Sequence, residues 1–356
     1  MVGILALSGL AVAWTSYRRT VSELETRRRG DRLTALYVDV AAQGYRIDTQ
    51  FQNMEEALEG LRTAAEWALT GPDPAAAAPR VFLATDFVDP KLRPADFTDK
   101  TRYRWPVSMD SPVAALAPGT DRAALMPKLR RLAMLRDHMA DMFIVAGGAT
   151  PALLSPESKR RYLLDRKSPI DYAYVALPDG VHFMLPGMDS MPPDYDVRTS
   201  TFYTMSANKR GRRWGAPYAD STTDEQGDDL VLPCTQGLWS RSGEYLGVAG
   251  VEITVTKIVE TGLALPGRAT VRTSLLDGKG KKVIDSGDAN KRFKTSGKDE
   301  GLVLSDFDIP EIAQAARSGV EGLRELTHRG KKLIVVLVRV DVLGWYYVVE
   351  LDPALL

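Results

Sequence analysis

Cysteine and histidine are scarce in this chain. Its 356 residues include one cysteine, Cys234, and three histidines, His138, His182 and His328. A single cysteine excludes a disulfide framework within the chain. Three scattered histidines, with no pair at metal-ligand spacing, do not indicate a zinc site. Cys234 ends an apolar run, and we predict that it is a packed strand residue and not a nucleophile.

The chain also lacks an excess of charge and the common catalytic signatures. Lys plus Arg and Asp plus Glu both total 46, so the formal net charge is zero and nothing global points to nucleic acid. There is no Walker-type loop and no Gly-x-Ser-x-Gly elbow, and Gly278-Lys279-Gly280 lacks the third glycine of a dinucleotide fingerprint. These absences predict a protein that is not an enzyme, with no cofactor, no metal and no nucleic-acid partner.

The longest apolar run lies at the N-terminus. Residues 1–14 are almost wholly apolar, and Arg18 and Arg19 follow. The run is shorter than the roughly 20 residues of a full span, and it lacks the basic segment and cleavage site of a secretory signal. We interpret residues 1–16 as a transmembrane helix whose first residues are missing, although the arginines after it oppose this orientation. A buried N-terminal helix is the alternative.

A long stalk helix is predicted over residues 17–70. The segment has no proline, and its apolar or small residues recur at alternating steps of three and four. Such a stripe can pack within the chain or against a partner helix, so a homodimer through the stalk stays open. Thr70-Gly71-Pro72 ends the pattern. The stripe consists of Leu33, Tyr37, Val40, Gly44, Ile47, Phe51, Met54, Leu58, Leu61, Ala65 and Ala68.

A second amphipathic helix is predicted over residues 121–145. We expect Met134, Met139 and Met142 to belong to the core beside it, because no cofactor motif accompanies them. The face that points to the core carries Leu125, Leu129, Leu132, Leu135, Met139 and Phe143.

From residue 172 onward the apolar pattern has a period of two, which is typical of strands. Pro178-Asp179-Gly180 predicts a turn between two of them, and we expect His182 on a polar face of the second. Two successive antiparallel units behind one long helix predict an α+β fold. The expected strands are residues 80–84, 172–176, 181–185, 229–236 and 245–254 in a unit of residues 71–262, and 269–276, 282–285, 323–327, 333–340 and 345–351 in a unit of residues 263–356.

The stretch from Asp194 to Glu252 carries candidate binding chemistry. It gathers phenols, an arginine, an indole and carboxylates between the predicted strands. Pockets for small polar molecules combine aromatic walls with a few placed charges in this way. The same residues can also form a hydrogen-bonded structural core, and chemistry alone does not choose between the two.

The order of these residues resembles the double Cache (dCache) family of extracytoplasmic sensor domains of bacterial transmembrane receptors. The family pattern is a Tyr-Asp-Pro-Arg-x-Arg-Pro-Trp-Tyr core, then Pro-Tyr-x-Asp, then a strand ending Gly-x-x-Gly-x-Asp-Ile. The resemblance covers most of the chain and includes the last Gly-Trp-Tyr strand. The matching segments are residues 194–203, 217–220, 247–253 and 344–346.

The resemblance implies two PAS-like antiparallel-sheet domains on the long helix, the first of them distal to the membrane. It implies a region after about residue 17 that lies in the periplasm or outside the cell, on a protein of the inner membrane. The implied function is to bind a small molecule in the distal domain and to pass a conformational change to the membrane. The alternative is a ligand-independent anchored scaffold that partners another membrane protein. The implied ligand-binding residues are Tyr174, Tyr195, Arg198, Ser200, Phe202, Tyr203, Trp214, Tyr218, Asp220 and Glu252.

Three positions depart from the family pattern. Ser200 stands where the second arginine of the core holds an amino-acid carboxylate, Phe202 replaces the tryptophan, and Glu252 replaces the final aspartate. The departures remove the main carboxylate grip, so an amino-acid ligand is not indicated.

Overall fold

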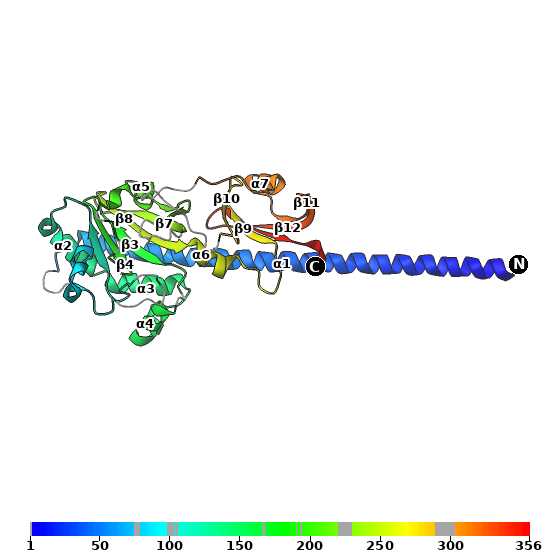
Figure 1. The fold of residues 1–356 in the computed structure, drawn as a ribbon, viewed down its shortest axis with the longest axis horizontal. Coiled ribbons are helices and arrows are strands. Elements are labelled where there is room, and N and C mark those ends of the chain that lie inside the picture. The colour runs from blue at the N-terminus through cyan, green and yellow to red at the C-terminus, as the bar shows by residue number, and fades with distance from the viewer. Residues whose placement is uncertain are drawn as a thin grey trace.

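In the computed structural model, one long helix carries two mainly antiparallel sheets that follow each other along it (Figure 1). The N-terminus lies at the end of the helix that is remote from the first sheet (Figure 1). This arrangement confirms the predicted α+β class. The described residues are 2–74, 79–97, 103, 106–165, 168–189, 191–192, 194–219, 230–288 and 303–356.

The long helix α1 (Val2–Thr70) contains 69 residues and ends where Gly71 and Pro72 follow, as predicted. Most of the predicted stripe, including Val40, Phe51 and Leu58, is buried against the two sheets and the helix α3 (Arg136–Ala146), which confirms packing within the chain. The predicted span at residues 1–16 falls largely on side chains outside the described part. Across the described residues, no helix has both the length and the apolar character that crossing a bilayer requires.

The first sheet has eight strands in the order β1-β2-β4-β3-β8-β7-β5, with β6 beside β7. Its pairs are antiparallel except β1 with β2, and the predicted turn joins β3 to β4 with Gly180 at φ +85°. Cys234 is fully buried in β7, as predicted. The strands are β1 Phe82–Leu83, β2 Val113–Leu116, β3 Tyr172–Ala176, β4 Val181–Leu185, β5 Arg212–Trp214, β6 Tyr218–Ala219, β7 Leu230–Trp239 and β8 Tyr245–Thr254.

The predicted helix over residues 121–145 is two helices, α2 (Arg122–Ala133) and α3 (Arg136–Ala146). The N–H groups of Met134 and Leu135 donate to carbonyls three residues back, and this tighter turn ends α2 and redirects the chain. Met134 is therefore 41% exposed, so the expectation that it fits the core was wrong. Two further helices were not predicted, α4 (Pro156–Leu164) and α5 (Thr201–Ser206).

The second sheet has five strands in the order β10-β9-β13-β12-β11. Arg329 and Gly330, at φ +50° and +77°, form the two-residue turn between β11 and β12, a geometry that matches the twist of a hairpin. Helix α7 (Pro310–Arg317) covers one face of the sheet, and α1 packs on the other. The strands are β9 Arg272–Leu276, β10 Lys282–Asp285, β11 Gly322–His328, β12 Lys331–Val340 and β13 Trp345–Leu351.

A short helical segment joins the two sheets. It consists of α6 (Val255–Ile258) and the π-helix η6 (Val259–Leu263). The Gln43 side-chain amide of α1 donates to the Gly262 carbonyl, and the Tyr347 hydroxyl of β13 donates to the Leu263 carbonyl at 2.7 Å. The joint is therefore held by the long helix and by the second sheet.

Candidate ligand-binding site

A cluster of polar aromatic side chains lies in the core of the first sheet, where β3, β4 and β8 meet α5. Tyr174 of β3 and His182 of β4 share one face, with ring centroids 5.4 Å apart. Glu252 of β8 lies on the same side, two residues beyond the cross-strand partner of Tyr174. All three side chains are at least 95% buried, so three adjacent strands bring phenol, imidazole and carboxylate groups together away from solvent.

Two phenols converge on one carboxylate oxygen. The Tyr174 hydroxyl donates to Glu252 Oε1 at 3.0 Å, and the Tyr218 hydroxyl of β6 donates to the same oxygen. Burial, and then the nearby Glu252 carboxyl, hold the pKa of Tyr174 well above its usual range, so this phenol remains a donor. The site therefore presents a carboxylate that buried donors orient.

Gly250 makes this convergence possible. The Tyr174 ring lies across the backbone of β8, and a Cβ atom at residue 250 would lie 2.4 Å from two of its ring carbons. Only glycine lets the ring approach so closely and reach Glu252. The glycine of the Gly-x-x-Gly segment thus has a direct structural role in the site.

A second chain of polar groups runs beside the carboxylate. The Tyr195 hydroxyl lies 3.1 Å from His182 Nδ1 and 3.2 Å from Ser200 Oγ. Burial lowers the pKa of His182 to about 3, so the imidazole is neutral at physiological pH. Among the described groups, His182 Nε2 has no hydrogen-bond partner.

His182 corrects the prediction of a strand residue on a polar face, because it is 3% exposed and lies inside the cluster. Sequence reasoning missed it as a site residue. The available signal was the period of two in a strand: His182 lies two residues before Met184, the cross-strand partner of Tyr174, and alternate residues of a strand share a face.

Phe202 of α5 closes the aromatic side of the cluster. Its ring centroid lies 4.4 Å from that of Tyr174 and 5.4 Å from that of His182. Ser200, in the position of the family's second arginine, is the residue before the first turn of α5 and is 2% exposed. The structure therefore brings together six of the residues singled out from the sequence, Tyr174, Tyr195, Ser200, Phe202, Tyr218 and Glu252.

The other candidate residues have different partners. Arg198 binds the Asp196 carboxylate through Nε at 2.8 Å and Nη2 at 2.6 Å, and this pairing lowers the pKa of Asp196. Trp214 donates its indole N–H to Glu55 of α1 at 2.9 Å. Tyr203 follows Phe202 in α5 and is buried, which raises the pKa of its hydroxyl. Asp220 lies outside the described residues.

The described residues include no group of three or more His, Cys, Asp or Glu side chains placed to hold a metal ion. Within the part of the chain that the structure covers, the chemistry of the cluster is thus that of phenols, one imidazole, one hydroxyl and one carboxylate.

No family model matches the chain, and no curated protein matches it. Solved structures do match. The ligand-binding domain of the Pseudomonas aeruginosa amino-acid chemoreceptor PctC in complex with GABA is similar at 16% identity and a TM-score of 0.47, over 90% of this chain and 100% of that chain. The ligand-binding domain of the Campylobacter jejuni chemoreceptor Tlp3 with L-valine is similar at 10% identity and a TM-score of 0.44, over 92% and 96%.

Proposed function

We propose that this chain is the extracytoplasmic sensing region of a membrane-anchored receptor and that it binds a small polar molecule at the cluster around Glu252. The observation that carries this proposal is the convergence of the Tyr174 and Tyr218 hydroxyls on one buried carboxylate oxygen. A buried carboxylate is costly unless it is well paired. A site that keeps a carboxylate buried is suited to recognising a group with hydrogen-bond donors, because the carboxylate oxygens accept hydrogen bonds.

The same contacts favour a class of ligand. Glu252, supported by two phenols, can accept a hydrogen bond from an ammonium or a hydroxyl group. Arg198 is bound to Asp196, and Ser200 replaces the arginine that would grip a carboxylate in the family pattern. We therefore propose a ligand held through an amine or through hydroxyl groups, and not one anchored by its carboxylate.

The proposed route to the membrane is α1, with residues 71–262 as the distal unit and residues 263–356 as the proximal unit. Helix α1 packs on both sheets, so a change in the distal core reaches the proximal one through a single element. A ligand shifts this equilibrium only if it binds one of the two conformations better. We place the sensing region in the periplasm or outside the cell, on an inner-membrane protein.

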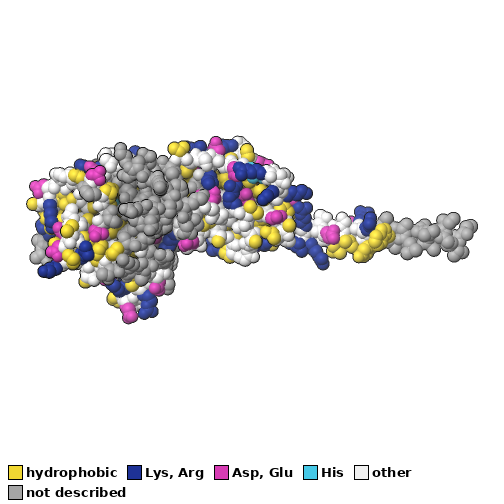
Figure 2. Space-filling view, in the orientation of Figure 1, with side chains coloured by type: hydrophobic (Ala, Val, Ile, Leu, Met, Phe, Trp, Pro, Cys, Tyr) yellow, Lys and Arg dark blue, Asp and Glu magenta, His cyan; other side chains and the backbone are white. Residues whose placement is uncertain are grey.

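We also propose that α1 mediates a homodimer. The stripe predicted from the sequence is used within the chain, but a second stripe on the opposite side of α1 is exposed. Apolar side chains gather on the part of α1 that extends beyond the second sheet (Figure 2). The large exposed residues of this second stripe are spaced by seven residues or a multiple of seven. They are Tyr17, Leu24, Val38 and Tyr45.

A thermal-shift screen of amines, polyols and amino acids tests the binding proposal. At least one amine or polyol is expected to raise the melting temperature of the chain. Glu252→Gln is expected to weaken this response by about tenfold or more, because a charge-assisted hydrogen bond is lost. Glu157→Gln, at an exposed carboxylate of α4, is the matched control and is expected to respond like the wild type.

A ligand-independent anchored scaffold is the second candidate function. It is favoured by the burial of the cluster, since Tyr174, His182, Ser200 and Glu252 are all at most 5% exposed and bonded to other members. A screen in which no compound stabilises the wild type would select the scaffold over the sensor.

A further inference from the structure

Positive charge is concentrated at one end of the second unit. Residues 25–32 of α1 and residues 325–332 of the β11–β12 hairpin contain seven Lys or Arg and three Asp or Glu residues, whereas the whole chain has no net charge. Figure 2 shows Lys and Arg side chains gathered at the end of the second unit from which α1 emerges. The cations that form this surface, the basic patch, are Arg27, Arg28, Arg32, Arg329, Lys331 and Lys332.

Helix α1 and strand β12 run side by side in the same direction. At the end of β12, the Val342 N–H donates to the Asp48 carboxylate at 2.8 Å. Nearer to the N-terminus of α1, Arg29 pairs with Glu325, whose cross-strand partner is Ile334. Higher residue numbers in α1 therefore lie beside higher numbers in β12. The hairpin turn that precedes β12 must then lie on the side of the N-terminus of α1.

Most cations of the basic patch are exposed and are not held by a carboxylate. Arg32 donates to the Leu356 carbonyl at 2.9 Å, which is a neutral acceptor. The side chains that have neither an ion pair nor a hydrogen bond within the described part of the chain are those of Arg27, Arg28, Lys331 and Lys332. The patch is therefore open to a negatively charged partner.

The carboxylates near the patch do not cancel its charge. Glu325 is paired with Arg29. Asp308 lies 3.4 Å from Arg329, but it also accepts a hydrogen bond from Arg272 at 2.6 Å. With seven cations against three carboxylates, residues 25–32 and 325–332 keep a net charge of +4 when His328 is neutral.

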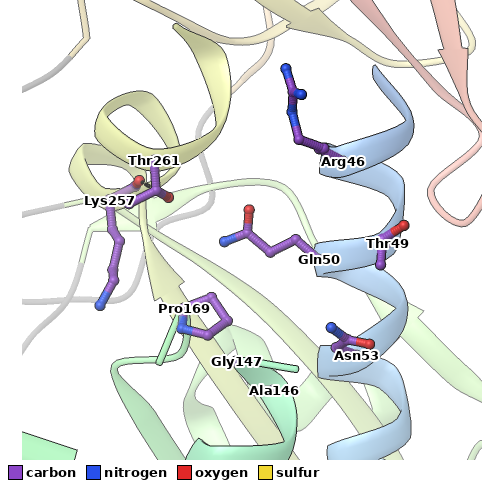
Figure 3. Close-up of a pocket in the computed structure, with 9 residues that line it drawn as sticks. All are labelled: Arg46, Thr49, Gln50, Asn53, Ala146, Gly147, Pro169, Lys257 and Thr261. Atoms are coloured by element: carbon purple, nitrogen blue, oxygen red, sulfur yellow. Dashed lines mark hydrogen bonds between the residues drawn. The ribbon is translucent and has the colours of Figure 1, made fainter. Parts of the chain in front are cut away.

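The cations beside the joint do not form a similar patch. They line a cavity of about 310 Å³ between α1, the end of α3 and the α6–η6 segment. Figure 3 shows that Arg46 and Lys257 point to different ends of this cavity. Positive charge is therefore gathered at the end of the second unit and not at the joint.

The position of the patch along α1 sets a condition on any contact with lipid. Arg29 lies 13 residues after residue 16, the end of the proposed membrane span, which is about 20 Å of helix. The field of a charged surface falls off within about 8 Å at physiological ionic strength. The patch therefore reaches lipid only when α1 tilts towards it, and membrane helices tilt by about 20° on average and up to about 40°.

We propose that the basic patch docks on the anionic phospholipid headgroups of the membrane that anchors α1. This inference rests on the membrane anchoring proposed above. Lys and Arg side chains near an anionic surface each contribute to binding, and phosphate oxygens accept hydrogen bonds from both. Docking holds α1 tilted, so the proximal unit has a docked and an undocked state whose balance depends on the lipid charge.

Fluorescence energy transfer in lipid nanodiscs tests this docking on the whole chain. Thr327→Cys places a dye at an exposed residue beside the patch, and the dye attaches selectively because Cys234 is fully buried. The acceptor is a lipid labelled on its headgroup. We expect more transfer in nanodiscs that contain phosphatidylglycerol than in nanodiscs of phosphatidylcholine alone. Chloride at about 1 M is expected to remove the difference, because it shortens the screening length to about 3 Å.

Lys331→Gln combined with Lys332→Gln is expected to lower the ratio of docked to undocked chains about tenfold or more. Lys91→Gln combined with Arg241→Gln removes the same charge from exposed residues of the first unit and is expected to behave as the wild type. A native circular dichroism spectrum shows that each variant is folded.

The proposal is overturned if transfer in the wild type is the same in both lipids, an outcome that would favour an acidic protein as the partner of the patch. It is also overturned if the Lys331 and Lys332 double variant docks as well as the wild type. A chain that does not elute with the nanodiscs would contradict the membrane anchoring itself, whereas a chain that does so without responding to lipid charge would contradict the docking alone.

Discussion

Tyr174 and Tyr218 each donate a hydrogen bond to Glu252 inside the core. Tyr174→Phe removes one of these donors and leaves the carboxylate less well paired. We expect the free energy of unfolding to fall by about 1–3 kcal/mol, the usual effect of losing a buried hydrogen bond to a charged group. Urea denaturation measures this change. Tyr45→Phe, at a tyrosine that is 73% exposed, is expected to change stability very little, and equal losses in both variants would contradict the role of Tyr174.

The buried imidazole of His182 makes stability depend on pH. Burial lowers its pKa to about 3, whereas in the unfolded chain the imidazole binds the proton near its ordinary pKa of 6.5. Between these values the unfolded state carries one more proton, so stability is complete above pH 6.5 and falls by about 1.4 kcal/mol per pH unit as the pH drops.

Urea denaturation between pH 4 and 7 tests this slope. His182→Gln is expected to remove the part of the slope that comes from the imidazole. The phenols of Tyr174 and Tyr195, which face residue 182, remain in this variant. His138→Gln, at an exposed histidine of α3, is expected to keep the wild-type slope. An unchanged slope in His182→Gln would show that this imidazole does not control the acid sensitivity.

Alanine substitution at two glycines, Gly250 and Gly60, is expected to change the stability of the chain in opposite directions. Gly250→Ala places a Cβ atom 2.4 Å from the Tyr174 ring, so the ring must move away from Glu252, at a typical cost of about 1–3 kcal/mol. Gly60→Ala in α1 meets no atom within 4 Å and is expected to stabilise the chain by about 0.5–1 kcal/mol, because alanine favours the helix. Thermal melting of both variants measures the pair, and a stable Gly250→Ala would rule out the described packing.

Among the elements, α1 has two apolar stripes with different roles. The inner stripe is covered by the two sheets, and the outer one carries Tyr17, Leu24, Val38 and Tyr45, which are 49–73% exposed. Charged residues at 28 and 31 interrupt the outer stripe. An isolated helix gains little stability in water, so the outer stripe favours association with a second copy.

Leu24→Glu combined with Val38→Glu is expected to convert the proposed dimer to a monomer, because two charges would then face the partner helix in an apolar seam. Sedimentation equilibrium of the whole chain measures the change. Thr26→Glu is the control, since residue 26 is exposed on the other side of the same segment. A wild type that is monomeric at high concentration would refute the dimer.

The elements that the sequence predicted well are those with local signals. Strands β8, β10 and β13 and the hairpin of β3 and β4 follow from a period of two and from turn residues such as Gly180. Strand β2 was missed, because its four residues lie among prolines and its pairing with β1 and β4 is distant in sequence. Local pattern carries no information on such partners.

The sequence likewise predicted some residues of the candidate site and not others. Chemistry and order pointed to Tyr174, Tyr218 and Glu252, which do meet. The burial of His182 and the packing of Trp214 on α1 depend on which face of each strand is covered. That property arises only when the sheet and the long helix come together, so periodicity within one strand could not reveal it.

For the whole molecule, one core cluster continues from the first sheet through α1 to the inner face of the second sheet. A compound that stabilises the cluster around Glu252 is therefore expected to increase amide protection in β13 as well as in β8. Hydrogen exchange with and without the compound measures both strands. Tyr347→Phe removes the hydrogen bond to the joint and is expected to reduce the effect in β13 selectively. Protection confined to β8 would contradict transmission through the joint.

The described contacts of α1 with the second unit begin where Arg29 pairs with Glu325 and Arg32 donates to the Leu356 carbonyl at 2.9 Å. From there the helix runs on past the body of the molecule to its N-terminus (Figure 1). At 1.5 Å per residue, the segment before Arg29 is a lever of about 40 Å. A tilt of about 5° at its base would move the tip by roughly 3.5 Å over this length. A rearrangement too small to alter any strand pairing can thus become a displacement comparable to the width of a side chain.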